Sequence, residues 1–396
     1  MVFTKLKKLI QNHPPTLGQN EKYFVRKALE KGEIALLGSY IKNFKNSISK
    51  FIGAKYVNLV SNGTSAIHLA LLAAGVNHND EVIVPSFTFI GSCNPILYCG
   101  ARPIFFDVNE FHCINEKQVI NFIKKKTIFK RNNCYNKSSK KIIKAIIIVH
   151  MWGNAAKIDK LIKLCKKNNI KVIEDAAESL GTSFIEGKYK NKLTGTIGDI
   201  GCLSFNSNKI VTTAGGGAVL TKNKKTYDLI ESLKNQGRKF SKLYDHEHIG
   251  YNYNLSNIQS AIGYAQIQDL NKKIDIKKKI FFEYKIFFNN NENFELLHSP
   301  RYSKSNFWMN ILKIKNHKIN KKKLITHFKN NKIEIRDVWR PCHIQPKFTQ
   351  FMTQKLDKTD EIYKKCICLP SGFNLTKNKI KKICKTFSSY ESMFNN

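Results

Sequence analysis

The sequence predicts an α/β protein with two domains: a large domain built on a mostly parallel mixed sheet flanked by helices, and a smaller C-terminal α+β domain. Strand and helix patterns alternate at the spacing of βαβ units through the first part of the chain. The apolar run at residues 145–149 is continuous, as in strands buried on both faces. A chain of 396 residues is also long enough for two cores. We expect residues 1–268 to form the large domain and residues 269–396 the small one.

The N-terminal part of the chain leads into a motif that suits an anion. The elements expected before it are a mixed helical segment at 1–30, an amphipathic helix at 39–51 and a short strand at 56–60. Gly63 then relieves a turn, and Thr64 and Ser65 begin an Ala/Leu-rich helix. The N–H groups and hydroxyls at such a helix N-terminus form an anion site. An ordinary Ser/Thr helix cap is the alternative explanation of the same residues.

The middle of the large domain is expected to alternate strands and helices. In order, the pattern predicts a strand at 80–85, a helix at 91–99, a strand at 102–108, an exposed helix end and loop in the basic segment 124–144, a buried strand at 145–149, a helix at 158–165 and a strand at 171–175. The last strand delivers Glu174 and Asp175 at its carboxyl end, where open α/β sheets bind ligands. A helix cap is the alternative role for a single Asp there.

One lysine stands out by its position. Lys209 follows Ser204-Phe-Asn-Ser-Asn and lies between two expected strands, at 201–205 and 218–221, with three glycines after it at 215–217. Desolvation favours the neutral, nucleophilic form of an amine, so a lysine in this place is a candidate for Schiff-base chemistry. An ordinary hairpin lysine is the alternative, because most lysines are solvated surface charges.

The remainder of the chain predicts a second, smaller unit. The expected elements are a helix after 221, a helix at 258–270, a lysine-rich helix from about 271, a strand at 306–315, a helix at 321–329, a strand at 333–338 and a final helix from 376. His246 and His248 lie in a polar loop between the first two helices. A pair of histidines at i, i+2 with no third ligand nearby is a weak metal pattern, so no metal site is expected.

Composition limits the function classes. The net charge is +38, but only seven of the 67 basic residues are arginine, and the lysines are spread along the chain. A specific nucleic-acid binder would gather such charges with aromatic residues on one surface, so we keep nucleic-acid binding as a distant alternative. The ten cysteines form no Cys-x-x-Cys pair, and no apolar run approaches the roughly 20 residues that span a bilayer. We expect a soluble, unexported, cytoplasmic protein with reduced thiols and no membrane insertion.

Five spaced motifs together resemble one family. They are Ser61-Asn-Gly-Thr-Ser-Ala, Pro85-Ser-Phe-Thr-Phe89, Glu174-Asp175-Ala-Ala-Glu-Ser, Ser204-Phe-Asn-Ser-Asn-Lys209 and Gly250-Tyr-Asn-Tyr-Asn-Leu. From about residue 15 to 375 the chain resembles the DegT/DnrJ/EryC1/StrS family of pyridoxal 5'-phosphate (PLP) sugar aminotransferases, which have the aspartate aminotransferase fold (fold type I). The resemblance therefore implies PLP as cofactor and L-glutamate as amino donor.

The resemblance also implies roles for individual residues. Lys209 is expected to hold PLP as a Schiff base and to move the proton, and Asp175 to pair with the pyridinium nitrogen. The expected cofactor-binding residues are Gly63, Thr64 and Ser65 with Ser204 at the phosphate, Phe89 stacked on the ring, and Asn252 and Asn254 at the phosphate of a neighbouring subunit. The last pair implies a homodimer with shared active sites. Two residues depart from the common pattern: Glu178 replaces a glutamine expected at the cofactor hydroxyl or the substrate, and Asn254 replaces an arginine.

The Asn-x-Asn-Lys form of the lysine motif and the segment 336–343 are most similar to the bacillosamine/legionaminic-type branch. The implied reaction moves the amino group of L-glutamate to C4 of a UDP-linked 4-keto-6-deoxy-N-acetylhexosamine. The substrate candidates are Trp152, Arg336, Arg340 and His343, since guanidinium groups suit phosphate oxygens; structural surface roles are the alternative for the last three. A GDP-linked 4-keto sugar leading to perosamine, or a 3-keto sugar, stays open as the acceptor. A PLP protein without catalytic activity is a further alternative, which Lys209 and Asp175 disfavour.

Overall fold

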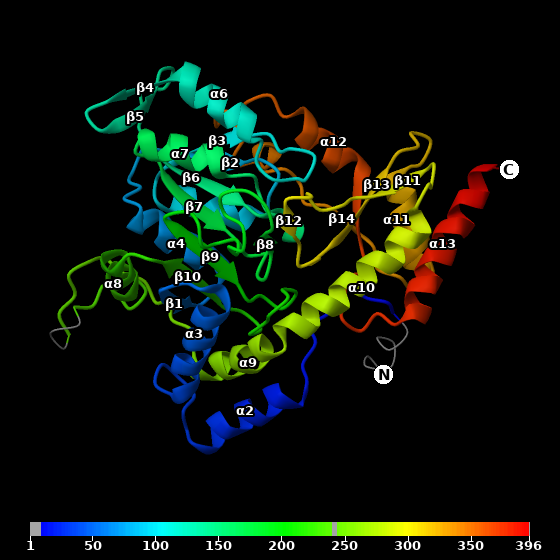
Figure 1. Cartoon of the computed structure of the whole chain (residues 1–396), viewed down its shortest axis with the longest axis horizontal. Helices are drawn as coiled ribbons and strands as arrows, with labels where there is room; N and C mark the ends of the chain where they lie inside the picture. Colours follow the sequence, from blue (N-terminus) through cyan, green and yellow to red (C-terminus); the bar gives the residue numbers. More distant parts are fainter. Residues whose placement is uncertain (1–8, 240–243, 396) are drawn as a thin grey trace.

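The computed structural model describes residues 9–239 and 244–395 and is centred on a seven-stranded sheet (Figure 1). The strand order is β1-β10-β9-β7-β6-β2-β3. The parallel strands are β2 (Glu81–Pro85), β3 (Arg102–Phe106), β6 (Ile143–Val149), β7 (Lys171–Asp175) and β9 (Ile200–Ser204). β10 (Gly217–Thr221) runs antiparallel to both of its neighbours, β9 and β1 (Tyr56–Val60). The predicted mostly parallel mixed sheet is confirmed.

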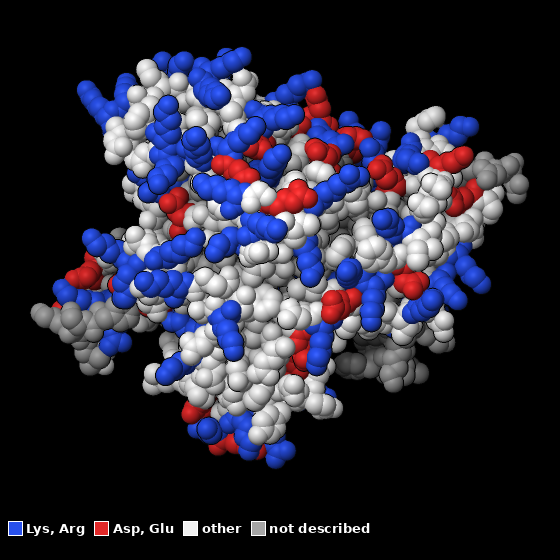
Figure 2. All heavy atoms as spheres, viewed as in Figure 1, with Lys and Arg blue, Asp and Glu red and all other residues white. Residues whose placement is uncertain are grey.

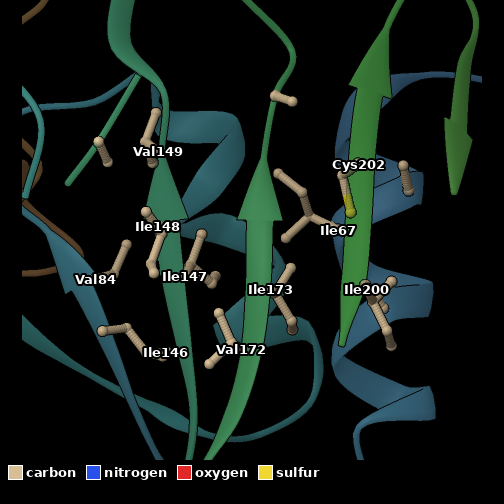
Figure 3. Packing of buried hydrophobic residues seen from close by; sticks show 14 of the residues in the cluster. Ile67, Val84, Ile146, Ile147, Ile148, Val149, Val172, Ile173, Ile200 and Cys202 are labelled. Carbon is tan, nitrogen blue, oxygen red and sulfur yellow. The ribbon is translucent and has the colours of Figure 1, made fainter. Parts of the chain in front are cut away.

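Helices flank this sheet and bury its apolar side chains. They are α2 (Gln19–Glu30), α3 (Ser39–Ile52), α4 (Gly63–Ala73), α5 (Asn94–Tyr98), α6 (Glu116–Lys126), α7 (Asp159–Lys167), α8 (Lys224–Leu233) and α9 (Asn257–Gln268), with short 3-10 turns η1 (Ile90–Ser92) and η2 (Met151–Gly153). α4 packs against β7, β9 and β10, while α2 and α3 both pack against α9. Figure 3 shows Ile67 of α4 beside the apolar side chains of β7 and β9. These contacts fix the N-terminus of α4 near the strand ends.

The C-terminal part of the chain forms a second unit around a four-stranded antiparallel sheet of order β11-β13-β15-β14. Its strands are β11 (Phe294–Leu296), β13 (Asn310–Ile314), β14 (Arg336–Asp337) and β15 (Cys366–Leu369). Its helices are α10 (Leu270–Phe288), α11 (Lys321–Asn330), α12 (Asp357–Lys365) and α13 (Lys377–Asn395), with the 3-10 turn η3 (Cys342–Ile344). The long helix α10 carries the chain from the large sheet to this unit (Figure 1). A short pair, β8 (Ser183–Phe184) with β12 (Ser303–Lys304), links the two parts.

The segment before α2 belongs in space to the C-terminal unit. Ile10 packs in its hydrophobic cluster and forms a parallel bridge with Ile333. Asn12 donates from Nδ2 to the Cys368 carbonyl at 3.0 Å, across 356 positions of sequence. α9 ends at Gln268 and α10 begins at Leu270, yet Leu270 packs in the hydrophobic core around the seven-stranded sheet. The division at residues 268 and 269 therefore stays a prediction.

The structure corrects several predicted elements. The basic segment 124–144, expected as a helix end and loop, contains a hairpin of β4 (Thr127–Lys130) and β5 (Asn133–Asn136), in which Thr127 and Asn136 are buried. The strand expected at 306–315 begins only at Asn310, and that at 333–338 is reduced to β14. α12 and β15 were not predicted, because no turn signal separates the helical pattern from the four buried residues of β15. Within the described ranges no helix is both long and apolar enough to cross a membrane.

Candidate functional site

A cavity of about 230 Å³ lies at the carboxyl ends of the parallel strands. Val149, Asp175 and Ser204, the last residues of β6, β7 and β9, line it. α4 contributes its first turn, and the C-terminal unit contributes two tryptophans. The predicted residues that the structure brings together around this cavity are Gly63, Thr64, Phe89, Asp175, Glu178, Ser204 and Lys209. A larger groove of about 740 Å³ beside α10 and β11 contains none of them.

Lys209 presents its amine to this cavity from a tight turn after β9. Its backbone N–H donates to the Asn206 carbonyl at 2.9 Å, which closes the turn. The side chain is 11% exposed, with Nζ 3.5 Å from Glu178 Oε1. The same Nζ lies 4.0 Å from the centroid of the Trp308 ring, a cation–π distance. The amine is therefore held between a carboxylate and an aromatic ring at the cavity wall.

Asp175 is a buried carboxylate at the base of the cavity. Its Oδ2 accepts a hydrogen bond from Ser92 Oγ at 2.7 Å, and its Oδ1 accepts from the Ala177 N–H at 3.1 Å. Ser92 also lies 2.9 Å from Thr88 Oγ1, so two hydroxyls from the turn after β2 fix the carboxylate. A buried anion with these neutral partners favours a cationic or protonated group in the cavity.

Glu174, the neighbouring carboxylate, has a structural role instead. It lies on the other side of the strand, where His150 Nε2 donates to it at 2.9 Å and the Ile197 and Gly198 N–H groups donate at 2.6 Å each. Burial alone would raise the pKa of Glu174, but the His150 hydrogen bond and charge, with the backbone donors, hold this pKa below its usual value. Glu174 thus fastens the loop before β9 to β7.

The first turn of α4 forms the polar end of the cavity. The Asn62 side chain caps the helix by accepting the Ser65 N–H at 2.7 Å. The N–H groups of Gly63 and Thr64 come before the first intrahelical bonds, so they are available to an anion in the cavity they line. A Cβ on Gly63 would stand 2.8 Å from Ser204 Cβ, so only glycine lets β9 approach this closely. Ser65 itself is buried and faces Ser61 Oγ at 3.1 Å, outside the cavity lining.

Glu178 is buried beside Lys209 and has a second partner. Its Oε2 accepts the backbone N–H of Trp152 at 2.8 Å. Burial raises the pKa of Glu178, and the charge of Lys209 opposes that shift. The Trp152 ring is buried behind this contact, 5.3 Å from the Phe87 ring, and does not line the cavity.

Five other predicted residues lie outside the cavity lining of the single chain. Asn252 is exposed, and Asn254 Nδ2 donates to the Lys234 carbonyl at 3.3 Å. Arg336 is exposed and pairs with Glu334 at 2.6 Å, while Arg340 donates from Nη2 to the Ile344 carbonyl at 3.0 Å. His343 is half-buried, with Nδ1 2.7 Å from Ser86 Oγ. The roles expected for them, as for Ser65 and Trp152, stay predictions.

The sequence profile of the DegT/DnrJ/EryC1/StrS aminotransferase family matches residues 15–388 of the chain. The chain belongs to this family. It is 34% identical to the GDP-perosamine synthase of Escherichia coli O157:H7, over 97% of this chain and 99% of that protein. It is 32% identical to the UDP-4-amino-4,6-dideoxy-N-acetyl-beta-L-altrosamine transaminase of Campylobacter jejuni serotype O:23/36, over 62% of this chain and 61% of that one. Aminotransferases of the DegT/DnrJ/EryC1/StrS family depend on PLP, so this chain is a PLP-dependent sugar aminotransferase.

The fold agrees with the family. The Helicobacter pylori aminotransferase PseC superposes with a TM-score of 0.86 over 97% of this chain and 100% of that chain, at 23% identity. The expected aspartate aminotransferase type of fold is thereby confirmed.

Sequence reasoning missed part of the cavity wall. The residues that line it without having been predicted include Asn62, Thr88, Gly91, Ser92, Asn206, Asn208, Trp308 and Trp339. Asn206 and Asn208 lie inside the lysine motif, and their place in it was the available signal. Trp308 and Trp339 come from the C-terminal unit. The signals available were that the chain has only three tryptophans and that Trp339 lies inside the segment 336–343 named above.

Proposed function

We propose that this enzyme moves the amino group of L-glutamate to C4 of a nucleotide-linked 4-keto-6-deoxy sugar, with Lys209 and Asp175 as its catalytic residues. One observation carries the proposal: the Lys209 amine, the Asp175 carboxylate and the N-terminus of α4 open onto the same cavity. These three groups suit the aldehyde, the ring nitrogen and the phosphate of one PLP molecule.

The residues of the cavity fit PLP in charge and shape. Asp175, held by Ser92 and Ala177, would keep a proton on the ring nitrogen. Gly63 and Thr64, with Ser204, would receive the phosphate at the positive end of α4. Phe89 lines the cavity and remains 50% exposed, so its ring is available for stacking. When bound, PLP supplies an electron sink for the carbon that loses or gains a proton.

Lys209 would hold the cofactor covalently and, once released, carry the transferred proton on Nζ. The geometry supports both tasks, because Glu178 Oε1 and the Trp308 ring keep Nζ in the cavity at 3.5 and 4.0 Å. Asn208 is tied to the C-terminal unit by the Trp308 Nε1 donor at 2.8 Å, which limits motion of the lysine turn. Such restriction is what a repeated proton transfer over a short path requires.

The nucleotide of the acceptor is the finer part of the proposal. The lysine motif resembles that of the UDP-sugar branch, which favours a UDP-linked N-acetylhexosamine as the acceptor. The Campylobacter transaminase, whose name contains a UDP-linked sugar, is similar to only 62% of this chain. The GDP-perosamine synthase of E. coli matches over 97%. We therefore propose the GDP-linked 4-keto-6-deoxy sugar as the first acceptor to test, with the UDP-linked sugar as the second candidate.

A homodimer with shared active sites is part of the same proposal. Leu37 is 86% exposed and Ile249 is 92% exposed, although both side chains are apolar. The Asn257 N–H donates to the Ala35 carbonyl at 2.6 Å, which joins the segment before α3 to the start of α9. Ile249 precedes Asn257 by eight residues. A subunit interface would cover such large apolar side chains, which the single chain leaves in water. Asn252 and Asn254, outside the cavity of their own chain, would then reach the phosphate of the other subunit.

Absorbance of the purified, PLP-loaded enzyme tests the proposal. L-Glutamate should bleach the visible band of the lysine-bound cofactor, and the correct keto sugar should restore it. Lys209→Ala should abolish this cycle, whereas Lys222→Ala, at an exposed lysine after β10, should cycle like the wild type. If glutamate leaves the band unchanged, the enzyme does not use this donor. If neither sugar restores a bleached band, the proposed acceptors are wrong.

A further inference from the structure

The three tryptophans of the chain gather at one place. Trp152 in η2, Trp308 before β13 and Trp339 after β14 are far apart in sequence. In the structure the Trp308 and Trp339 rings stack with centroids 6.3 Å apart and planes at 18°. The Trp152 and Trp339 centroids lie 5.8 Å apart. Two of the three, Trp308 and Trp339, line the cavity that holds Lys209.

Trp308 is the fixed member of this cluster. It is 1% exposed, and its Nε1 donates to the Asn208 carbonyl at 2.8 Å. Its own carbonyl accepts from Lys277 Nζ at 3.2 Å, and Lys277 is fully buried. The ring N–H and the backbone carbonyl of Trp308 are therefore both hydrogen-bonded, and the ring forms a rigid wall next to the Lys209 amine.

Trp339 rests on that wall and still faces the cavity. It is half-buried, between the buried residues Val338 and Pro341, which hold its backbone in place. Its ring also meets Phe89 at 6.1 Å and 61°. Trp339 thus contacts three aromatic rings and is also one of the residues that line the cavity. It offers an apolar surface to whatever sits beside Lys209.

We propose that Trp339, supported by Trp308, positions the acceptor sugar by packing against its C5–C6 side; this inference rests on the proposed function. In a 4-keto-6-deoxy sugar, the C6 methyl group is two bonds from C4, the carbon that must reach the reaction centre. An aromatic wall buries a methyl group favourably, whereas it leaves a C6 hydroxyl without a hydrogen-bond partner. Trp339 thereby selects 6-deoxy acceptors over their 6-hydroxy counterparts.

The test separates the two half-reactions, each followed by cofactor absorbance under single-turnover conditions in the PLP-loaded enzyme. Trp339→Ala should keep the glutamate half-reaction within about twofold of wild type, because glutamate has no C5–C6 side to pack. The same variant should slow the sugar half-reaction about tenfold or more, the usual size of a lost apolar pocket contact. Trp339→Phe should restore most of that rate, and the preference for a 6-deoxy over a 6-hydroxy acceptor should fall in Trp339→Ala.

Phe282→Ala is the matched control, because Phe282 is a half-exposed aromatic residue in the groove beside α10. It should leave both half-reactions at wild-type rates. If the wild type cycles and Trp339→Ala slows both half-reactions equally, or neither, the inference about Trp339 is overturned while the proposed function stands. If the wild type reacts with glutamate and with no 4-keto-6-deoxy sugar, the proposed function falls, and this inference with it.

Discussion

Glu178 is a carboxylate at a place where burial makes negative charge costly. Burial raises its pKa above the ordinary value of 4.5, although Lys209 and the Trp152 N–H favour the charged form. Because the folded pKa exceeds the unfolded one, the protonated side chain stabilises the fold below about pH 4.5, and that contribution is lost as pH rises through the folded pKa. Glu178→Gln removes this titration. The free energy of unfolding of the wild type relative to the variant should therefore decline from pH 4.5 to 7.

Urea unfolding of the cofactor-free protein at several pH values measures this difference. Glu361→Gln is a useful comparison, because the pKa of Glu361 is shifted in the opposite direction. Hydrogen bonds from Lys313 and Lys358 lower the pKa of Glu361 to about 2. A constant difference between wild type and Glu178→Gln across this range would contradict the prediction.

Lys277 is the second residue whose environment predicts a measurable effect. It is fully buried, and its Nζ donates to His13 Nε2 at 2.6 Å, to the Trp308 carbonyl at 3.2 Å and to the Ser371 carbonyl. Burial and the nearby amine hold the pKa of His13 well below its usual range, so its imidazole can accept this bond. Lys277→Met removes a buried amine but leaves these acceptors without a donor. We expect the free energy of unfolding to fall by about 1–3 kcal/mol.

The adjacent Lys278 provides the control, since it is exposed on the same helix. Lys278→Met should change the urea midpoint little, while Lys277→Met should lower it clearly. Equal midpoints for the two variants would show that the three bonds contribute nothing net.

At the scale of elements, the contact between α4 and β9 depends on the absence of one side chain. Gly63→Ala would normally favour a helix, by up to about 1 kcal/mol. Here the new Cβ would stand 2.8 Å from Ser204 Cβ, and overpacking of this kind costs about 1–3 kcal/mol. Gly63→Ala should therefore lower the melting temperature of the cofactor-free enzyme. The loss should be much smaller when Ser204→Gly is present, because the overlapping Cβ is then gone.

A double-mutant cycle of Gly63→Ala and Ser204→Gly measures this coupling directly. Additive effects of the two substitutions would mean that the helix end can move away from β9. The cycle measures the stability of the cofactor-free enzyme rather than its affinity for PLP. The hydroxyl that Ser204 would offer the phosphate therefore does not affect the result.

Elements also differ in how well the sequence predicts them. β1 has the predicted bounds, because four of its five residues are apolar and a turn follows at once. β4 and β5 were predicted as loop, since lysines and asparagines dominate that segment. Their pairing is set by buried Thr127 and Asn136, and by Asn136 Nδ2 donating to Glu81 Oε2 at 2.9 Å. A contact between residues 55 positions apart leaves no local pattern in the sequence.

At the scale of the whole molecule, charge is the dominant feature. The net charge is +38, and Figure 2 shows Lys and Arg side chains scattered across the visible face, among fewer acidic ones. Such a distribution repels itself in the folded state, and salt screens that repulsion over a Debye length of about 10 Å at 0.1 M. The melting temperature should rise by about 2–5 °C between 20 and 300 mM NaCl. Calorimetry at both salt concentrations checks this, and a flat or falling profile would contradict it.

The site was predictable wherever one short segment carries the chemistry. Lys209 and Asp175 stand in motifs whose residue types already suit PLP, and the structure places both at one cavity. Ser92 could not be predicted, because its role is to orient Asp175, 83 positions away. Trp308 was missed for the same physical reason, because the C-terminal unit brings it to the cavity through packing. Trp339 stood in the segment 336–343 of the resemblance, but its place at the cavity also comes from packing.

The contact of Asn12 with Cys368 and Ser371 has a consequence for folding during synthesis. Asn12 donates to the carbonyl of Cys368, and the Ser371 N–H donates back to the Asn12 carbonyl at 2.6 Å. On the ribosome, the segment around Asn12 emerges 356 positions before its partner Cys368. The large sheet can form during translation, but the C-terminal unit closes only after residue 371 has left the exit tunnel. A nascent chain that stalls before that point lacks the Ser371 carbonyl, one of the acceptors of Lys277, the buried lysine that also donates to the Trp308 carbonyl.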